Sequence, residues 1–348
     1  MKLVSYCFSL SFVFFLVLPY KSACSITQVN DVIYNGFEQF LGTIHTYRCD
    51  QLRGGLSKNT QYVCSVNDNK YVVRILKESL SIRQGEVNNH LVAARHTIAP
   101  TIHYYDEDEY SFVIMDFIDG QTLLFEHANR CDVLDLIVRT MKAIAQFDDT
   151  VSSVRTIDLR ALMACYYDKI QAYADVTLHS LIANGLRIFE VVYQSIENEY
   201  RPLVFSHNDL HPRNIFYLQN DMVIIDWETG ALNYELYDVA NYSVYACLHE
   251  ADEYYLLTQY LECFPSDDNL EYFKKVKLLV KVFNAFGFLI CLDHMPDTSD
   301  MELVKDFSYY ARIFAQDANA NDPEFLYELA MSLLQEFFED FEQIEHDK

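Results

Sequence analysis

The chain reads Val204-Phe205-Ser206-His207-Asn208-Asp209-Leu210-His211-Pro212-Arg213-Asn214-Ile215 and, a few residues later, Val223-Ile224-Ile225-Asp226-Trp227-Glu228. Polar side chains stand here at the ends of short apolar runs. The runs at 214–218 and 222–226, separated by turn-forming residues, predict a β-hairpin. Asp209 and Asn214 lie five positions apart in the loop that opens this hairpin, and Asp226 ends its return strand. The hairpin can therefore bring these three side chains together.

These three residues suit phosphoryl transfer from ATP. A carboxylate has to accept or orient the proton of the attacking hydroxyl, and hard oxygen ligands have to hold magnesium on the phosphates. Asp209 can do the first, and the amide of Asn214 with the carboxylate of Asp226 can do the second. The alternative is a polar loop with capping carboxylates. The spacing H-x-D-x-x-x-x-N, followed by an apolar strand that ends in I-D, favours phosphoryl transfer.

An earlier segment offers partners for a nucleotide. Arg74 lies near the end of a predicted strand, where its alternation places it as a kinase lysine that contacts phosphates. Glu86, on the next predicted helix, can hold Arg74 as an ion pair, although an ordinary surface salt bridge is the alternative. The stretch Gly54-Gly55-Leu56-Ser57 can admit phosphate to backbone N–H groups, or it can be a plain turn.

The pattern of apolar residues predicts a small β-rich lobe followed by a large helical lobe. The predicted elements are a helix over 31–41, a hairpin over 61–66 and 70–76, a helix over 81–95 capped by Ser81, a hairpin over 101–105 and 111–117, helices from 122 to 200 and from 235 onwards, and an acidic helix over 323–345 that is expected only to present a solvated face. This order indicates an α+β architecture with a cleft between two lobes. We place the boundary at Asp119-Gly120, so that 25–119 is the ATP-binding lobe and 120–348 the catalytic and substrate lobe. Met115 and Phe117 then fall at the junction, where adenine can bond to the backbone.

Composition limits the class of partner. The 348 residues carry 26 Lys and Arg against 51 Asp and Glu, for a formal net charge of −25. A surface this acidic repels nucleic-acid backbones and attracts small cations. The nine cysteines form no CxxC pair, so we expect scattered, buried, reduced thiols, which are typical of a reducing compartment.

The N-terminus indicates the opposite compartment. Met1-Lys2 precedes an apolar run from Leu3 to Leu18 and small residues near Cys24, the parts of a secretory signal peptide. The segment 1–24 can also be a membrane anchor, which would bring the protein into membrane contact, or a buried first helix. ATP use and the cysteine pattern favour cytosolic action. The sequence gives no indication of oligomeric state.

These motifs resemble the choline/ethanolamine kinase branch of the aminoglycoside-phosphotransferase-like superfamily, over about residues 50–315. The resemblance rests on the catalytic H-N-D-x-x-x-x-N loop at 207–214, the metal-binding I-D-[FW]-E at 225–228, the stretch Asn233-Tyr234 with Asp238-Val239-Ala240-Asn241, and a G-G-[LM]-[ST]-N phosphate loop at 54–59 with Lys58 inserted. Arg74 is characteristic, because this branch uses arginine at that position.

The resemblance implies a protein-kinase-like fold and specific roles. Asp209 is expected to be the catalytic base, with His207 and Asn208 in the same loop. Asn214 and Asp226 are expected to bind Mg²⁺. The residues expected to organise ATP are Gly54, Gly55, Ser57, Asn59, Arg74, Glu86, Met115 and Phe117. The implied substrate is a small cationic amino alcohol, usually choline, phosphorylated on its hydroxyl, which an acidic, aromatic pocket can attract.

The acceptor half of the pattern departs from the family. Tyr245 stands near the position of a family Glu, and Phe286 near that of a late Trp pair; with Glu228 these are the candidate substrate contacts. Ethanolamine, thiamine, an aminoglycoside or a sugar therefore stay open as acceptors beside choline. A non-catalytic protein with this fold is a further alternative. Protein phosphorylation is disfavoured, since D-F-G and A-P-E signatures are missing from the sequence.

Overall fold

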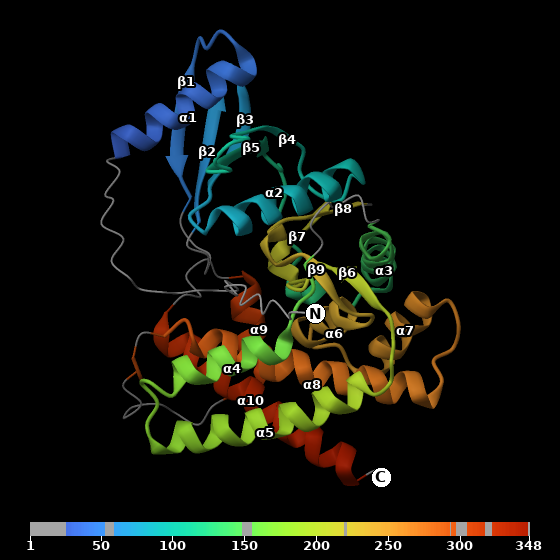
Figure 1. The fold of residues 1–348 in the computed structure, drawn as a ribbon. Coiled ribbons are helices and arrows are strands. Elements are labelled where there is room, and N and C mark those ends of the chain that lie inside the picture. The colour runs from blue at the N-terminus through green and yellow to red at the C-terminus, as the bar shows by residue number, and fades with distance from the viewer. Residues whose placement is uncertain are drawn as a thin grey trace, which may run out of the picture.

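A computed structural model describes residues 26–52, 59–147, 155–218, 221–292, 294–296, 305–316 and 322–346. These residues form two parts, a β-sheet with two helices and a larger, mainly helical part (Figure 1). The expected bilobal α+β fold is confirmed. The predicted boundary at Asp119-Gly120 stays a prediction. The signal-like segment 1–24 and the glycines 54 and 55 with Ser57 lie outside the described residues.

The first part is built on a five-stranded antiparallel sheet with the strand order β1-β2-β3-β5-β4. Its elements are α1 (Ile26–Leu41), β1 (Tyr47–Gln51), β2 (Thr60–Val66), β3 (Asn69–Ile75), α2 (Leu80–Arg95), β4 (Ile102–Tyr105) and β5 (Phe112–Asp116). Both predicted hairpins are confirmed, as β2–β3 and β4–β5. Strand β1 was not predicted. The predicted cap at Ser81 is wrong: α2 begins at Leu80, and Ser79 stands at the cap position without a side-chain hydrogen bond.

Alternation along the strands gives the sheet two apolar faces, and one helix covers each (Figure 1). On one face, Val73 and Ile114 pack with Phe37 of α1. On the other face, Val113 packs with Val87 of α2. Helix α2 is therefore fixed against the side of the sheet that carries the candidate site.

The prediction of scattered, reduced thiols is wrong for one pair. Cys49 of β1 and Cys64 of β2 lie opposite each other in the antiparallel ladder and form a disulfide. Because pairing depends on how distant strands meet, the spacing of cysteines could not indicate it. The expectation of burial is also wrong for Cys131 and Cys263, which are free and exposed.

Breaking the disulfide is expected to destabilise the protein. Cys49 and Cys64 are 15 positions apart, so the bond closes a short loop and should contribute about 3 kcal/mol to the free energy of unfolding. Cys49→Ser leaves the buried Cys64 thiol in place. Thermal melts with and without a reducing dithiol should show a lower midpoint for reduced wild type and no effect of the dithiol on Cys49→Ser. Equal melting of wild type in both conditions would contradict the bond.

The second part contains most of the helices and two small antiparallel ladders. Its elements are η1 (Phe125–His127), α3 (Cys131–Ala145), α4 (Leu159–Ile170), α5 (Val176–Glu197), β6 (Leu203–Ser206), η2 (Pro212–Asn214), β7 (Ile215–Leu218), β8 (Asp221–Ile224), η3 (Trp227–Thr229), β9 (Ala231–Tyr234), α6 (Tyr237–Tyr245), α7 (Glu250–Leu261), α8 (Asp267–Leu289), α9 (Phe307–Gln316) and α10 (Pro323–His346). The predicted hairpin is confirmed as β7–β8, whereas the pairing of β6 with β9 was not predicted.

The prediction that helix α10 only presents a solvated face is wrong. It packs along α8 and buries Leu329, Leu333 and Phe337 in the main core. Lys281 of α8, itself buried, forms ion pairs with the two α10 carboxylates Glu336 and Asp340. The acidic side chains of α10 therefore include partners of a buried cation as well as exposed groups.

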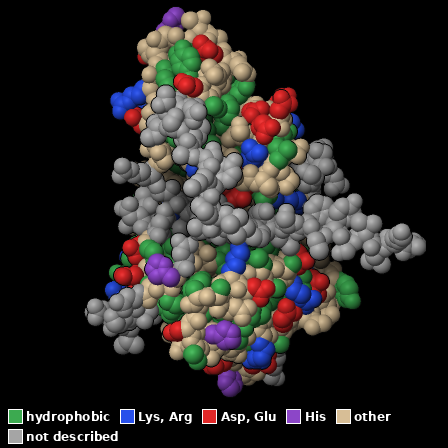
Figure 2. Space-filling model, turned by 60° about the vertical axis from the view of Figure 1, so that its left-hand side comes forward, with side chains coloured by type: hydrophobic (Ala, Val, Ile, Leu, Met, Phe, Trp, Pro, Cys, Tyr) green, Lys and Arg blue, Asp and Glu red, His purple; other side chains and the backbone are tan. Residues whose placement is uncertain are grey.

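The visible surface carries both signs of charge. Figure 2 shows acidic side chains on both parts of the molecule, interspersed with Lys and Arg. Among the described residues, no helix is long and apolar enough to span a membrane.

Candidate active site

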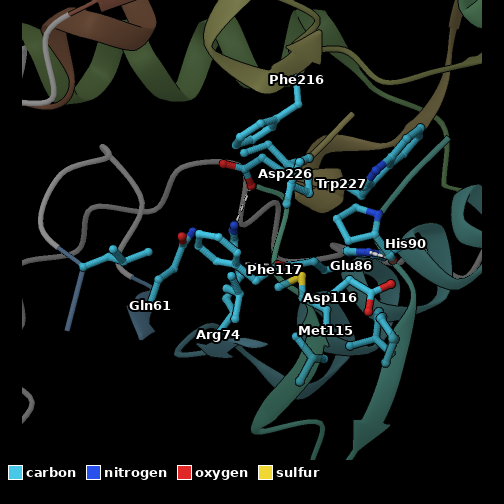
Figure 3. Close-up of a pocket in the computed structure, with 18 residues that line it drawn as sticks. Gln61, Arg74, Glu86, His90, Met115, Asp116, Phe117, Phe216, Asp226 and Trp227 are labelled. Atoms are coloured by element: carbon cyan, nitrogen blue, oxygen red, sulfur yellow. Dashed lines mark hydrogen bonds and ion pairs between the residues drawn. The ribbon is translucent and has the colours of Figure 1, made fainter. Parts of the chain in front are cut away.

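A cavity of about 140 Å³ lies where the sheet meets the β7–β8 ladder. Strands β3 and β5 supply Arg74 and Met115, α2 supplies Glu86 and His90, and the residues after β8 supply Asp226 (Figure 3). Met115 and Phe117 both line the cavity, as the junction position predicted. The cavity is thus walled by apolar side chains and ends in a group of charges.

Arg74 is the centre of this charged group. Its Nε lies 2.8 Å from Glu86 Oε1, and its Nη2 lies 2.8 Å from both Asp226 Oδ1 and Glu228 Oε2. Figure 3 shows the Arg74 side chain pointing from β3 toward Asp226. The predicted Arg74–Glu86 pair is therefore present, and it is buried rather than a surface salt bridge.

Three carboxylates share this single guanidinium, so their charges are not fully balanced. Burial raises the pKa of Glu86 to about 7, against the opposing charge of Arg74. Burial and the nearby Asp226 raise the pKa of Glu228 well above its usual value. Asn59 donates its amide to Glu228 Oε2 over 3.2 Å and to Glu86 Oε2 over 3.5 Å. Three carboxyl groups with raised proton affinity around one guanidinium form a site that a bound cation would stabilise in its ionised form.

The loop after β6 presents Asp209 beside Asn214. The Asn214 amide donates to the Asp209 carboxylate over 3.0 Å and to the Asp209 carbonyl over 2.9 Å. His211 Nε2 lies 3.4 Å from Asp209 Oδ1. Burial would raise the pKa of Asp209, but His211, His207 and the Asn214 hydrogen bond outweigh it, so the pKa is lowered. Asp209 is therefore an ionised, oriented carboxylate.

Asp238 shapes this loop from α6. Its two carboxylate oxygens accept the backbone N–H groups of His207 and Asn208, over 2.7 and 2.8 Å. Asn208 has a left-handed backbone with φ of 68°, and its side-chain amide donates to the Thr229 carbonyl. His207 and Asn208 thus support the loop structurally. Asp238 stands in a family motif, but its position in the sequence did not predict this contact.

Two further bonds connect the loop to Asp226. The N–H of Ile225 donates to the Asn214 carbonyl over 2.9 Å, and His207 Nε2 lies 3.0 Å from the Ile225 carbonyl. Asp226 follows with φ of 68° and ψ of 60°, a left-handed conformation that turns the chain into η3. The structure therefore brings Asp209, Asn214 and Asp226 to one place, as the hairpin predicted.

The donors present fit a magnesium ion. Glu86, Asp226 and Glu228 each offer a carboxylate oxygen, and these oxygens lie within 4.8 Å of one another. The nitrogen of the Asn214 amide is engaged by Asp209, so its oxygen is the atom that can reach a cation. Carboxylate and amide oxygens are the hard ligands that magnesium prefers. The sequence predicted Asn214 and Asp226 as metal ligands. It placed Glu228 near the acceptor and missed that Glu228 lies with Glu86 and Asp226 in this carboxylate group.

His90 closes the inner wall of the cavity. Its Nε2 lies 2.7 Å from the Pro100 carbonyl; because a carbonyl only accepts, Nε2 carries the proton. Burial lowers the pKa of His90 to about 4. The folded-state pKa lies below the unfolded value, so the stability it contributes is present above pH 6.5 and is lost as the pH falls through about 4.

Replacing His90 should flatten the acid limb of the stability profile. Between pH 6.5 and 4, wild type should lose about 3 kcal/mol more unfolding free energy than His90→Gln, because glutamine has no proton to take up. Urea unfolding at a series of pH values measures this difference. The exposed His249→Gln should follow wild type. Parallel profiles for wild type and His90→Gln would show that His90 is not held neutral.

A model of the family described as choline/ethanolamine kinase matches residues 49–279, which is more than half of the chain and includes all of the site described above. The chain belongs to the choline/ethanolamine kinase family. Ethanolamine kinase of Drosophila melanogaster is 24% identical over 248 residues, covering 64% of this chain and 47% of the relative. Human ethanolamine kinase 1 is 25% identical over 194 residues, covering 52% of this chain and 42% of the relative. The chain spans about half the length of these curated relatives.

The fold of the family extends beyond the matched residues. A crystal structure of a choline/ethanolamine kinase family protein from Mesorhizobium loti superposes with a TM-score of 0.63, covering 91% of this chain and 99% of that one at 16% identity. At this identity the likeness concerns the fold alone.

Beside His211 lies an aromatic cluster, which we define as Tyr245, Phe288, Phe307 and Phe314. The ring of Tyr245 lies 5.2 Å from His211 and 5.8 Å from Phe314, measured between centroids. Tyr245 is therefore next to the loop 207–214, but it is buried, and its role as an acceptor contact stays a prediction. Phe314 joins it from α9, and nothing in the spacing of the sequence indicated that.

Phe286 lies away from His211 and is not part of this cluster. Its ring lies against Gly185 of α5, where an added Cβ would be 3.4 Å away, and the side chain is fully buried. The expectation that Phe286 contacts substrate is not supported, because α8 turns this position into the helix core. The neighbouring Phe288 faces Phe314 instead.

Proposed function

We propose that this protein transfers the γ-phosphoryl group of ATP, with magnesium, to the hydroxyl of a small amino alcohol, ethanolamine or choline. The observation that carries the proposal is that the loop with the Asp209–Asn214 pair is hydrogen-bonded to Ile225, next to Asp226, and that Asp226 and its partner Arg74 line an apolar cavity. Family membership supports the same reaction class. In this proposal the nucleotide cavity and the loop with Asp209 both lie next to the β7–β8 ladder.

Each residue has a separate task in this proposal. The apolar wall with Met115 and Phe117 receives adenine. Asn214, Asp226 and Glu228 would hold magnesium, which when bound neutralises charge on the phosphates. Arg74 turns from its carboxylate partners toward phosphate oxygens. Asp209 accepts or orients the proton of the acceptor hydroxyl, for which an ionised carboxylate is required.

The acceptor is the less constrained part of the proposal. The curated relatives are named as ethanolamine kinases. The aromatic cluster beside His211 is buried, and Arg213 lies over its Phe314 ring at 4.8 Å, so it adds no open ring face to the argument. The chain's net charge of −25 favours a cationic acceptor over a neutral sugar. We therefore rank ethanolamine and choline ahead of thiamine, an aminoglycoside or a sugar.

An acceptor panel tests this ranking. ADP release would be measured with Mg-ATP and each of ethanolamine, choline, thiamine, kanamycin and glucose. Ethanolamine or choline should give the highest kcat/KM, at least tenfold above the others, if the acceptor follows the ethanolamine kinase relatives. The highest value for another acceptor would change the assigned substrate. Mg-ATP binding in a thermal-shift assay, with no turnover on any acceptor, would favour the non-catalytic alternative.

We further propose that the protein matures in an oxidising compartment. The sequence favoured the cytosol partly because of its cysteines, and the Cys49–Cys64 disulfide removes that argument. The signal-like segment 1–24 agrees with the disulfide. Mass spectrometry of the native protein, alkylated without reduction, would show its N-terminus and its cysteine pairs. Free Cys49 and Cys64 thiols with an intact residue 1 would overturn this proposal.

A further inference from the structure

Helix α2 has a glycine in its interior, at position 85, directly before Glu86. Glycine destabilises a helix interior relative to alanine, so its presence calls for a reason. An added Cβ at Gly85 would lie 3.1 Å from Nη2 and 3.2 Å from Cζ of Arg155. The guanidinium of Arg155 therefore lies against the helix backbone in a space that any larger side chain would reduce.

The backbone of Arg155 is fixed in the other part of the molecule. Its carbonyl accepts the N–H of Leu232 over 2.8 Å, and the N–H of Ile157 donates to the Leu232 carbonyl over 3.0 Å. Residues 155–157 thus run beside β9, with Thr156 in a parallel bridge to Leu232. The side chain extends from this rigid base toward α2.

The guanidinium also reaches the turn that carries the acidic group. Arg155 Nη2 donates to the Glu228 carbonyl over 3.2 Å. Burial lowers the pKa of Arg155, and the carboxylate of Glu86 opposes this shift. A single side chain therefore touches α2 beside Glu86 and the backbone two residues after Asp226.

A second contact on the same face of α2 supports this arrangement. Asn89 is four residues after Gly85, one helical turn along. Its amide donates to the carbonyls of Trp227 and Gly230, over 3.2 and 2.8 Å. Arg155 and Asn89 hold the two ends of one short helix–turn contact.

We propose that Arg155 is a positioning residue for nucleotide binding, which braces α2 on the turn Asp226–Gly230, and that Gly85 is needed to admit its guanidinium. This contact keeps the Glu86 carboxylate at ion-pair distance from Arg74, which also pairs with Asp226. Arg155 itself does not line the cavity. The effect on nucleotide affinity rests on the proposed function, whereas the effect on α2 does not.

The test is a double-mutant cycle of Gly85→Ala and Arg155→Ala with two readouts. Calorimetry gives the dissociation constant of Mg-ADP, and hydrogen exchange gives the protection of the α2 amides in the nucleotide-free protein. Arg155→Ala should weaken Mg-ADP binding about tenfold, since one charge-assisted bond is lost, and should speed exchange across α2. Gly85→Ala should weaken binding several-fold in wild type but not in Arg155→Ala, where its steric partner is gone.

Two control variants isolate the brace. Gly287→Ala, in α8, places its Cβ where no atom lies within 4 Å, and it should leave both readouts unchanged. Arg160→Ala removes an arginine of α4 that pairs with Glu190 of α5, and it should also leave both readouts unchanged. Gly85→Ala should also leave the melting temperature nearly unchanged, because the helix propensity gained with alanine offsets the loss of the Arg155 contact. If Gly85 had only a structural role, Gly85→Ala would not weaken Mg-ADP binding while the melting temperature stays the same.

Each outcome bears on the proposal separately from the proposed function. Faster α2 exchange in Arg155→Ala, with coupling to Gly85→Ala, supports the brace even if wild type phosphorylates no amino alcohol. Unchanged α2 exchange in Arg155→Ala overturns the brace even if wild type is an active kinase. Equal loss of Mg-ADP affinity from Gly85→Ala in both backgrounds also overturns it.

Discussion

Replacing Asp209 by Asn is expected to lower kcat by about 10³-fold, the range expected when a positioned proton acceptor is lost. Asparagine keeps the size of the side chain and an oxygen that can accept the Asn214 amide, so the loop should keep its shape. Since the proposed role of Asp209 is on the acceptor hydroxyl, Mg-ATP affinity should change by less than about threefold. Steady-state kinetics and calorimetry measure the two effects.

The exposed Asp168→Asn on α4 is the matched control and should retain wild-type kinetics. Two results would contradict the role of Asp209. One is near-normal kcat in Asp209→Asn. The other is an equal loss of kcat and of Mg-ATP affinity, which would place Asp209 on the nucleotide rather than on the acceptor.

Replacing Asp226 by Asn is expected to abolish magnesium-supported turnover, with a loss in kcat/KM on the order of 10³-fold. Asp226 has a left-handed backbone, which asparagine tolerates and alanine does not, so Asn removes the charge without straining the turn. Arg74 keeps Glu86 and Glu228 as partners, and the surplus of negative charge falls. Stability should therefore hold while metal affinity is lost.

Titration of activity and of Mn²⁺ binding against metal concentration separates these effects. Asp68→Asn is a matched control, because Asp68 is also left-handed, with φ of 67°, but lies in the β2–β3 turn. It should behave as wild type. Unchanged Mn²⁺ affinity in Asp226→Asn would show that the metal is held elsewhere.

The sequence was sufficient to place the loop of Asp209 and Asn214 near Asp226, because a local hairpin determines this geometry. Asp209, Asn214 and Asp226 are separated by one loop and two short strands, and β7–β8 returns the chain to its start. The Arg74–Glu86 pair was accessible for a similar reason, since a strand and the next helix carry them. Period-two alternation likewise identified β2, β3 and β5. Apolar clusters cover both faces of β3 and β5, and one of these clusters includes residues of β2.

Contacts between distant segments could not be read in this way. Strand β1, Tyr47–Gln51, has mostly exposed residues and so lacks an apolar period. Strand β6 pairs with β9, although the loop and hairpin of the candidate site separate them in the sequence. Phe314 of α9 contacts His211, although the two residues lie about a hundred positions apart. Phe286 was misplaced by the same limit, because the rotation of α8 about its axis decides which aromatic side chains face the loop.

The most direct test of the central claim is ³¹P NMR of the purified protein with Mg-ATP and either ethanolamine or choline. We expect the γ-phosphate signal to decline as a phosphomonoester signal of the amino alcohol grows, and we expect neither change with Asp209→Asn or Asp226→Asn. Loss of γ-phosphate only to inorganic phosphate, or an unchanged spectrum with both amino alcohols, would contradict the claim.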